Sequence, residues 1–332
     1  MSFLPPGVQS GTLAAFPQIA YDRTAIMEWQ FNTPVLEELC DFRPLARRSG
    51  RTLQFYGQQP YVAATNTLSE GIPGPSLSLS QVFSDAFADE YGDWIGISNV
   101  AQNMFLADVS LDAARNLSYR GALTANLVGI NAFEAAATAN ASSRIDLQDG
   151  EFLISNTIRK GEAQLVGNAV PVRDGGMYST IMHPFMSYDL FSDNSAGSAI
   201  DTLKRTEAGG TILKGGISRG YQVLEWSGCR IIRTQTVPTY TNYPSNGKTG
   251  YGMYTVGREA MLASELLGQR VPRNPNFKVN VKTFGDNDID LSNPMLQTRA
   301  IVSYDWFLGV VARPNTNSTM GFRRVRGEVS AV

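Results

Sequence analysis

Apolar and polar residues alternate along residues 77–88, a period of two that predicts a strand with one apolar face. The apolar members of this alternation are Leu77, Leu79, Phe83 and Phe87. Residues 52–56 form a second β-rich stretch, and the segment between the two contains TLSEGIPGP, whose glycines and prolines predict a turn. We therefore expect residues 51–98 to form a long hairpin. Such a hairpin is marginally stable alone in water, so it should pack against another subunit or domain.

The apolar spacing changes near residue 100 from two to three and four, which is typical of a helix. The positions that carry it are Phe105, Val109, Ala113, Leu117, Leu123, Leu127 and Ile130. They predict one helix that ends near Ala139 and is weakened at Gly121 and Gly129. A helix of nearly 40 residues is far longer than usual, so a sheet or neighbouring subunits should cover it.

The remaining segments predict a mixed α+β protein. Residues 1–16, rich in proline and small residues, suggest an extended arm; a helix should follow from Pro17, and a short one from Thr33-Pro34 to near Phe42. Residues 151–290 combine a helix at 152–166 with short strands and glycine-rich turns, and residues 297–312 predict a final pair of strands.

Composition indicates a subunit with large interfaces. Charged residues make up 17% of the 332 residues, whereas about 25% is usual in soluble domains. Of the 28 basic residues, 22 are arginine, which suits interface ion pairs better than lysine does. A soluble protein with an unusual surface is the alternative. The net charge of −2 provides no basic footprint for nucleic acid.

The sequence also predicts a reduced, cytosolic chain that does not cross a membrane. Only Cys40 and Cys229 are present, which indicates neither a disulfide framework nor a cysteine-rich metal site. The N-terminus lacks the basic start of a signal peptide, and no run approaches 18 apolar residues.

Three short motifs could carry chemistry, and each lacks a required part. Residues 216–220, GISRG, match the nucleophile elbow around Ser218, but the only histidine, His183, precedes the serine. Residues 246–249, NGKT, end like a phosphate-binding loop whose first glycine is missing, so a surface loop is expected. The Asp286, Asp288 and Asp290 turn lacks the glycine and glutamate of a calcium loop, which leaves a solvated acidic turn.

His183 follows a predicted buried strand at 177–182 and precedes Pro184, which suits the first position of a helix. With no second histidine, no clustered cysteines and no nearby glutamate, a zinc site would lack ligands. We therefore expect His183 to be a structural residue at a strand-to-helix junction.

Segments spread over nearly the whole chain share their order and spacing with one known family. They are DFRPLARRSGRTLQF (41–55), TLSEGIPGP (67–75), YGDWIGISN (91–99), HPFMSYDL (183–190), GGISRGYQVLEWSGCRIIRT (215–234), YTVGREAM (254–261) and DLSNPMLQ (290–297). In this order they resemble the major capsid proteins of tailed bacteriophages with the Hong Kong 97-type (Johnson) fold, particularly the coliphage N-four-type group. The family's compact Asp-Pro-Leu-x-Gln is loosened here, with Asp290 and Pro294 apart.

The resemblance implies an α+β capsid fold. Its parts would be an N-terminal arm (1–50), an extended loop (51–98), a peripheral domain with a spine helix (99–149), an axial domain (150–288) and return strands of the peripheral domain (289–332). Within the shared segments, the residues that we take as assembly or fold motifs are Arg51, Glu70, Gly71, His183, Pro184, Asp189, Gly257 and Gln297. No catalytic, cofactor or metal residue is implied.

The implied function is a shell of hexamers and pentamers around double-stranded DNA, with scaffolding, portal and decoration proteins as partners and no membrane. The fold's founding member cross-links its subunits through a loop lysine, but the first lysine here is Lys160. Two alternatives remain at this point: an encapsulin-like shell, and a serine hydrolase that uses Ser218.

Overall fold

The computed structural model describes the chain in eleven segments, and the arm helix expected from Pro17 lies outside them. The described residues are 34–45, 50–58, 81–98, 100–101, 109–193, 214–218, 221–245, 247–266, 280–283, 298–313 and 321–329. Their helices are α2 (Pro34–Leu39), α4 (Val109–Ala139), α5 (Ser155–Gly167) and α6 (Pro184–Ser192).

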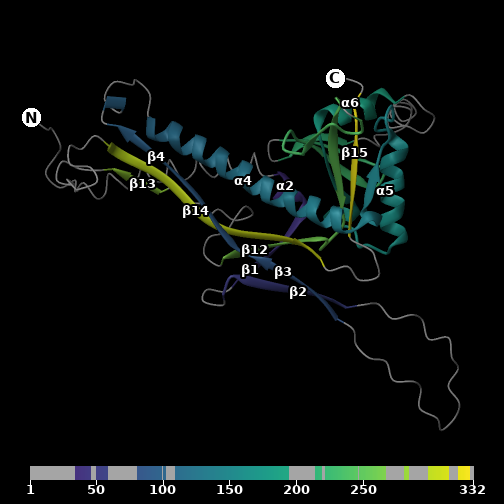
Figure 1. Cartoon of the computed structure of the whole chain (residues 1–332), viewed down its shortest axis with the longest axis horizontal. Helices are drawn as coiled ribbons and strands as arrows, with labels where there is room; N and C mark the ends of the chain where they lie inside the picture. Colours follow the sequence, from purple (N-terminus) through teal and green to yellow (C-terminus); the bar gives the residue numbers. More distant parts are fainter. Residues whose placement is uncertain are drawn as a thin grey trace, which may run out of the picture.

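A long sheet of five described strands forms one layer of the molecule (Figure 1). Its strands are β1 (Cys40–Leu45), β4 (Asp89–Ser98), β12 (Met261–Leu266), β13 (Asn280–Thr283) and β14 (Thr298–Ala312). The expected pair of strands at 297–312 is wrong, because β14 is one strand of 15 residues. Gly309 does not interrupt this strand, and a Cβ there would lie 2.2 Å from the carbonyl oxygen of Phe87. The glycine instead allows another backbone to approach closely.

The second sheet contains eight described strands and carries α5 and α6 (Figure 1). Its strands are β5 (Arg144–Asp146), β6 (Tyr178–Met182), β7 (Lys214–Ser218), β8 (Tyr221–Trp226), β9 (Cys229–Arg233), β10 (Thr239–Thr241), β11 (Thr249–Val256) and β15 (Phe322–Gly327). The short 3-10 turns η1 (Ala141–Ser143) and η2 (Asp174–Gly176) precede β5 and β6.

The chain crosses between the two sheets more than once. β12 and β13, from the segment expected to be axial, pair with β14 in the long sheet. β15, expected to return to the peripheral part, pairs with β11 and β5 in the eight-stranded sheet. Alternation along a strand shows which face is buried and not which strand lies beside it, so the sequence pattern could not decide these partners.

Helix α4 lies against β14, and its described part begins at Val109. Val100 and Ala101 are helical, and residues 102–108 lie outside the description. Gly129, expected to weaken α4, brings α2 close, since a Cβ there would lie 3.2 Å from the Cγ1 of Val35.

Two other expected helices differ at their ends. α2 stops at Leu39 instead of continuing to Phe42, because residues 40–45 form β1 and pair in parallel with β12. α5 begins at Ser155 instead of Phe152, which forms an isolated bridge with Glu328. In both cases pairing with a residue distant in the sequence decides the helix boundary, because tertiary contacts often override local preference.

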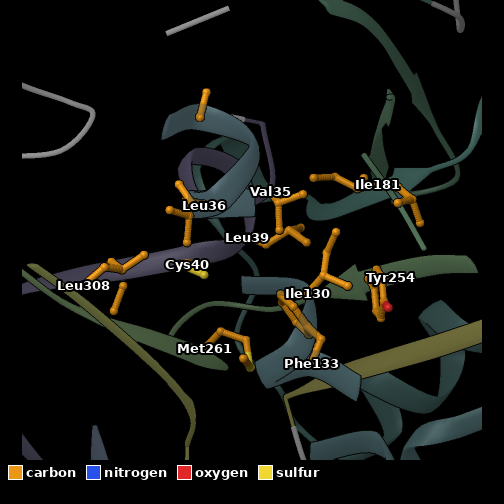
Figure 2. Close-up of a cluster of buried hydrophobic side chains, with 14 of the residues drawn as sticks. Val35, Leu36, Leu39, Cys40, Ile130, Phe133, Ile181, Tyr254, Met261 and Leu308 are labelled. Carbon is orange, nitrogen blue, oxygen red and sulfur yellow. The ribbon is translucent and has the colours of Figure 1, made fainter. Parts of the chain in front are cut away.

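The main core lies where α2, α4 and both sheets meet (Figure 2). Its labelled members come from α2, β1, α4, β6, β11, β12 and β14; they are Val35, Leu36, Leu39, Cys40, Ile130, Phe133, Ile181, Tyr254, Met261 and Leu308. The ring of Phe133 lies tilted against that of Tyr254 at 5.0 Å and meets Phe322 edge to face at 5.3 Å between ring centroids. One continuous core thus joins the two sheets through α4.

The expected hairpin is confirmed for its described part. β2 (Thr52–Gln58) and β3 (Gln81–Phe87) form an antiparallel pair that projects from the long sheet (Figure 1). Residues 89–98, expected within the same hairpin, instead form β4 and pair with β14. The two-stranded projection therefore ends at Ala88, where the chain enters the long sheet.

Candidate assembly interface

Arg51 holds the base of the hairpin. Its guanidinium forms an ion pair with Asp89, and its Nε donates to the carbonyl oxygen of Ala88 at 3.3 Å. The backbone N–H of Ala88 donates in turn to the carbonyl oxygen of Arg51 at 2.8 Å. One side chain thus fastens the first residue of the projection to the point where β3 passes into β4.

The two faces of the hairpin differ in exposure. Phe55 and Ala86 are buried with Leu262 of β12, so this face packs on the long sheet. Tyr56, Phe83 and Phe87 point the other way, with exposed fractions between 52% and 61%. The predicted alternation is confirmed over the described residues, and the apolar face that contains Phe83 and Phe87 is the exposed one. The sheet beneath the hairpin accepts the smaller Ala86, which leaves the aromatic face exposed.

His183 lies at the predicted junction, since β6 ends at Met182 and α6 begins at Pro184. Its Nδ1 caps the helix by accepting the N–H of Phe185 at 3.3 Å. The imidazole ring also lies 4.5 Å from the ring of Tyr251 between centroids. Burial lowers the pKa of His183, so the neutral imidazole that acts as a helix cap is the favoured form. Asp189, one of the motif residues, is buried in the same helix.

Gly257 occupies the crossing from β11 to β12. Its N–H donates to the carbonyl oxygen of Gly321 at 2.8 Å, which joins this crossing to the start of β15. A Cβ at Gly257 would lie 2.3 Å from the Cγ1 of Val170 and 2.9 Å from the carbonyl oxygen of Pro171. Lack of space therefore requires glycine at this position.

Arg173, which the sequence did not single out, joins β1 to the loop before β6. Its guanidinium donates to the carbonyl oxygen of Leu39 at 2.8 Å and pairs with Asp41 at 3.1 Å. Asp41 also accepts the N–H of Glu259 at 2.6 Å. Asp41 opens the shared segment at 41–55, but nothing in the sequence pattern pointed to its partner 132 residues away.

A ladder of alternating charges fastens α4 to the eight-stranded sheet. Arg324 of β15, only 2% exposed, pairs with Glu134 of α4 at 2.7 Å and with Asp146 of β5 at 3.3 Å. Arg326 continues the ladder by pairing with Asp146 at 2.8 Å. Buried charges need such partners, because an unpaired charge is costly to desolvate.

Two tyrosines complete this ladder. The hydroxyls of Tyr240 and Tyr254 donate to Oε1 of Glu134 at 2.6 and 2.5 Å. Burial raises the pKa of both phenols well above the usual value, and the neighbouring carboxylate raises it further. The phenols therefore remain donors, and α4 is held at its C-terminal half by side chains from three strands.

The geometry separates the two residues of the hydrolase alternative. Ser218 ends β7, while His183 follows β6, and β8 and β9 lie between these strands. Three strand spacings of about 4.8 Å place them roughly 14 Å apart, far beyond hydrogen-bond reach. Lys248, the lysine of the NGKT motif, pairs with Asp149 and with Glu328, the latter at 2.6 Å, so its charge is already compensated.

Further chemistry finds little support within the described segments. They contain no cluster of three or more metal-ligating side chains. Cys40 and Cys229 are buried free thiols whose pKa is raised by burial to about 12. Among the helices of this part of the chain, none has the length and apolar character needed to span a bilayer. Glu70, Gly71, Gln297 and the Asp286, Asp288 and Asp290 turn lie outside the described residues.

The motif residues that are described occupy three separate places. Arg51 holds the hairpin base, Gly257 lies at the sheet crossing, and the group of His183, Pro184 and Asp189 belongs to the start and body of α6. They form supports of the fold instead of one pocket. The exposed aromatic face of the hairpin contains Phe83 and Phe87, which the period of two had placed together on one apolar face.

Solved structures share this architecture. The chain matches the capsid of Ralstonia phage GP4 with a TM-score of 0.67 and 11% identity over 89% of this chain and 91% of the other. It matches the capsid of cyanophage Pam1 with a TM-score of 0.63 and 12% identity over 91% and 94%. The SrpI encapsulin of Synechococcus elongatus gives a TM-score of 0.51 and 10% identity over 89% and 87%.

A scan against models of protein families gives no match, and a search of curated protein sequences gives none either. The structural likeness nevertheless extends over most of the chain, so the fold is the α+β Hong Kong 97-type fold of phage capsid subunits. The coliphage N-four-type group is a finer assignment that stays a prediction.

Proposed function

We propose that the chain is a major capsid protein that assembles into the hexamers and pentamers of an icosahedral shell around double-stranded phage DNA. The observation that carries the proposal is the likeness to the GP4 capsid over 89% of the chain. The hairpin agrees with it, because it projects from the body with an aromatic face exposed. The role is structural and uses no catalytic residue or cofactor.

In this proposal the subunit belongs to the virion and assembles in the cytoplasm of the host bacterium. Its partners are other copies of itself, with scaffolding, portal and decoration proteins. The eight-stranded sheet is the axial part, around which copies cluster in a capsomer, and α4 with the long sheet is the peripheral part. DNA is enclosed without sequence-specific contacts, consistent with a net charge of −2.

Electron microscopy of particles that contain the chain tests the proposal directly. We expect closed icosahedral shells with capsomers of six and five copies. A purified chain that forms no shell, either alone or with the proteins of its own virion, would contradict it.

An encapsulin-like shell is the second candidate, favoured by the match to the SrpI encapsulin. The two candidates differ in what the shell contains. Particles that enclose a cargo protein and no genome would favour the encapsulin, whereas a portal complex and packaged DNA would favour the capsid.

We further predict that assembly needs a separate scaffolding protein or another assembly aid. The sequence of residues 1–50 predicts an arm and short helices, without the long charged helical segment of a built-in scaffold. The chain expressed alone should therefore give few regular shells in electron micrographs. Abundant uniform shells from the chain alone would show that no separate scaffold is needed.

A further inference from the structure

The turn between β5 and α5 contains the dipeptide Asp149–Gly150, a sequence that isomerises readily in flexible chains. Glycine has no Cβ to block the approach of its nitrogen to the preceding side chain. In this reaction the nitrogen of Gly150 bonds to Cγ of Asp149, and the N–H proton and the carboxyl hydroxyl leave as water. Water then opens the succinimide ring at either carbonyl, which gives aspartate again or isoaspartate. The mass stays the same and no other reactant is needed.

The turn holds the attacking nitrogen away from the carboxyl group. The N–H of Glu151 donates to the carbonyl oxygen of Gln148 at 3.0 Å, and Gly150 has a φ of 81°. This is the arrangement of a type II turn, which favours glycine at its third position. Such a turn directs the nitrogen of Gly150 away from the side chain of Asp149. The peptide plane between them must therefore rotate before a ring can close.

Lys248 and Glu328 form a clip over this turn. Glu328, only 7% exposed, accepts the N–H of Gly150 through Oε1 at 2.8 Å. Its Oε2 pairs with Nζ of Lys248 at 2.6 Å, and Lys248 also pairs with the carboxylate of Asp149. Rotation of the peptide plane would break the hydrogen bond to a buried carboxylate, so the clip opposes it.

Lys248 also acts on the carboxyl group that would be attacked. Its hydrogen bond and its positive charge lower the pKa of Asp149, so this carboxyl stays ionised. Ring closure expels the carboxyl oxygen as water, which a protonated carboxyl allows far more readily than a carboxylate does. The clip therefore restrains both reacting groups, the nitrogen through Glu328 and the carboxyl through Lys248.

We propose that Asp149 is a latent isoaspartate site, which isomerises when the clip of Lys248 and Glu328 opens. The proposal concerns a modification of the chain itself and does not depend on the shell function. Isoaspartate adds one carbon to the backbone where Gly150 bonds Glu328 and Phe152 forms a bridge with it. The longer turn would displace Gly150 from Glu328 and so weaken the attachment of the chain after β15.

Incubation of the purified full-length chain at neutral pH and physiological temperature tests the proposal. Peptide mapping measures isoaspartate at each position, because the isomer elutes separately at unchanged mass. Lys248→Met should raise the rate at Asp149 about threefold, since an exposed ion pair contributes at most a factor of about five. The wild type in urea, where the clip is absent, gives the upper limit of the rate.

Two controls separate the clip from a general loss of structure. Lys160→Met removes another exposed lysine, which lies on α5, and should leave the rate at Asp149 unchanged. Asp174–Gly175, the second Asp-Gly pair of the chain, lies in η2 and provides an internal reference. Its rate should be the same in the wild type and in every folded variant.

A rise at both Asp149 and Asp174 would mean that Lys248→Met loosens the whole fold. Lys248→Met combined with Glu328→Gln then replaces it, because this variant leaves no unpaired buried carboxylate. It should raise the rate at Asp149 alone. Equal rates at Asp149 in the wild type and in the folded variant would overturn the proposal. A folded wild type that isomerises as fast as the chain in urea would overturn it as well.

Discussion

His183 has a role that its chemistry alone did not reveal. An imidazole can act as base, ligand or cap, and the structure uses the Nδ1 lone pair to cap α6. The ring is held against Tyr251 and Phe185, at 4.5 and 5.0 Å between centroids. The cap requires only a hydrogen-bond acceptor at the position of Nδ1, whereas proton binding requires the imidazole ring. Substitutions that keep the acceptor and remove the ring can therefore separate the two roles.

We predict that His183→Asn keeps the cap, because its Oδ1 lies where Nδ1 lies, and that His183→Gln loses about 1 kcal/mol of stability. Both variants should still assemble.

Burial lowers the His183 pKa below its ordinary 6.5, so the unfolded chain binds the proton more readily. Wild-type stability should therefore fall as the pH drops below 6.5, and His183→Asn should lack this component. Thermal unfolding between pH 5 and 8 measures the difference, and parallel curves would refute it.

Gly257 and Gly161 form a matched pair for a second prediction. Gly257→Ala should destabilise the subunit by roughly 2–3 kcal/mol, because the methyl group overlaps Val170 and the carbonyl of Pro171. Gly161 lies within α5 with nothing near its Cβ position, so Gly161→Ala should stabilise by up to about 1 kcal/mol. Chemical denaturation gives both values. A neutral Gly257→Ala would mean that the crossing relaxes easily.

At the scale of elements, the hairpin and α4 differ in what holds them. α4 is fixed at one end by Glu134, which joins Arg324 and two tyrosines. The described hairpin contacts the rest of its chain through the Arg51–Asp89 ion pair at its base and through one face, where Phe55 and Ala86 pack on the long sheet. The hairpin is therefore the element that should matter more for assembly than for folding.

Deletion of residues 60–76 tests this difference. The circular dichroism spectrum and solubility of the subunit should stay unchanged, because both sheets and their cores lie elsewhere. Closed shells should be absent from electron micrographs, since a heterologous contact between copies is lost. Normal shells from the deleted chain would contradict an assembly role for this segment.

At the scale of the whole particle, subunits must be held without the lysine cross-link of the fold's founding member. Residues 51–98 contain no lysine, and Arg51 cannot replace one because its guanidinium stays protonated. Apolar burial, hydrogen bonds and ion pairs remain, and denaturants disrupt all of them.

Mature particles boiled in detergent should therefore run as a single band near 36.2 kDa. Wild-type particles treated with an amine-reactive cross-linker before boiling provide the positive control for a ladder. A ladder without the cross-linker would reveal a covalent bond at another position.

The sequence by itself determined the local elements. The period of two at 77–88 and the spacing of three and four after residue 100 predicted the hairpin and the long helix, and Pro184 after an apolar strand predicted the start of α6. The absence of loop lysines was likewise readable. Each of these features depends on residues that lie a few positions apart in the chain. The sequence alone therefore contains the information that predicts them.

Only the tertiary structure decided which strands pair and which faces stay exposed. β15 lies beside β11, Asp41 meets Arg173, and Arg324 meets Glu134 across 190 residues. The same alternation could have buried Phe83 and Phe87 or left them exposed. The choice depended on how Ala86 and Phe55 fit over Leu262, because a period of two identifies two faces and the packing surface beneath selects the one that is buried.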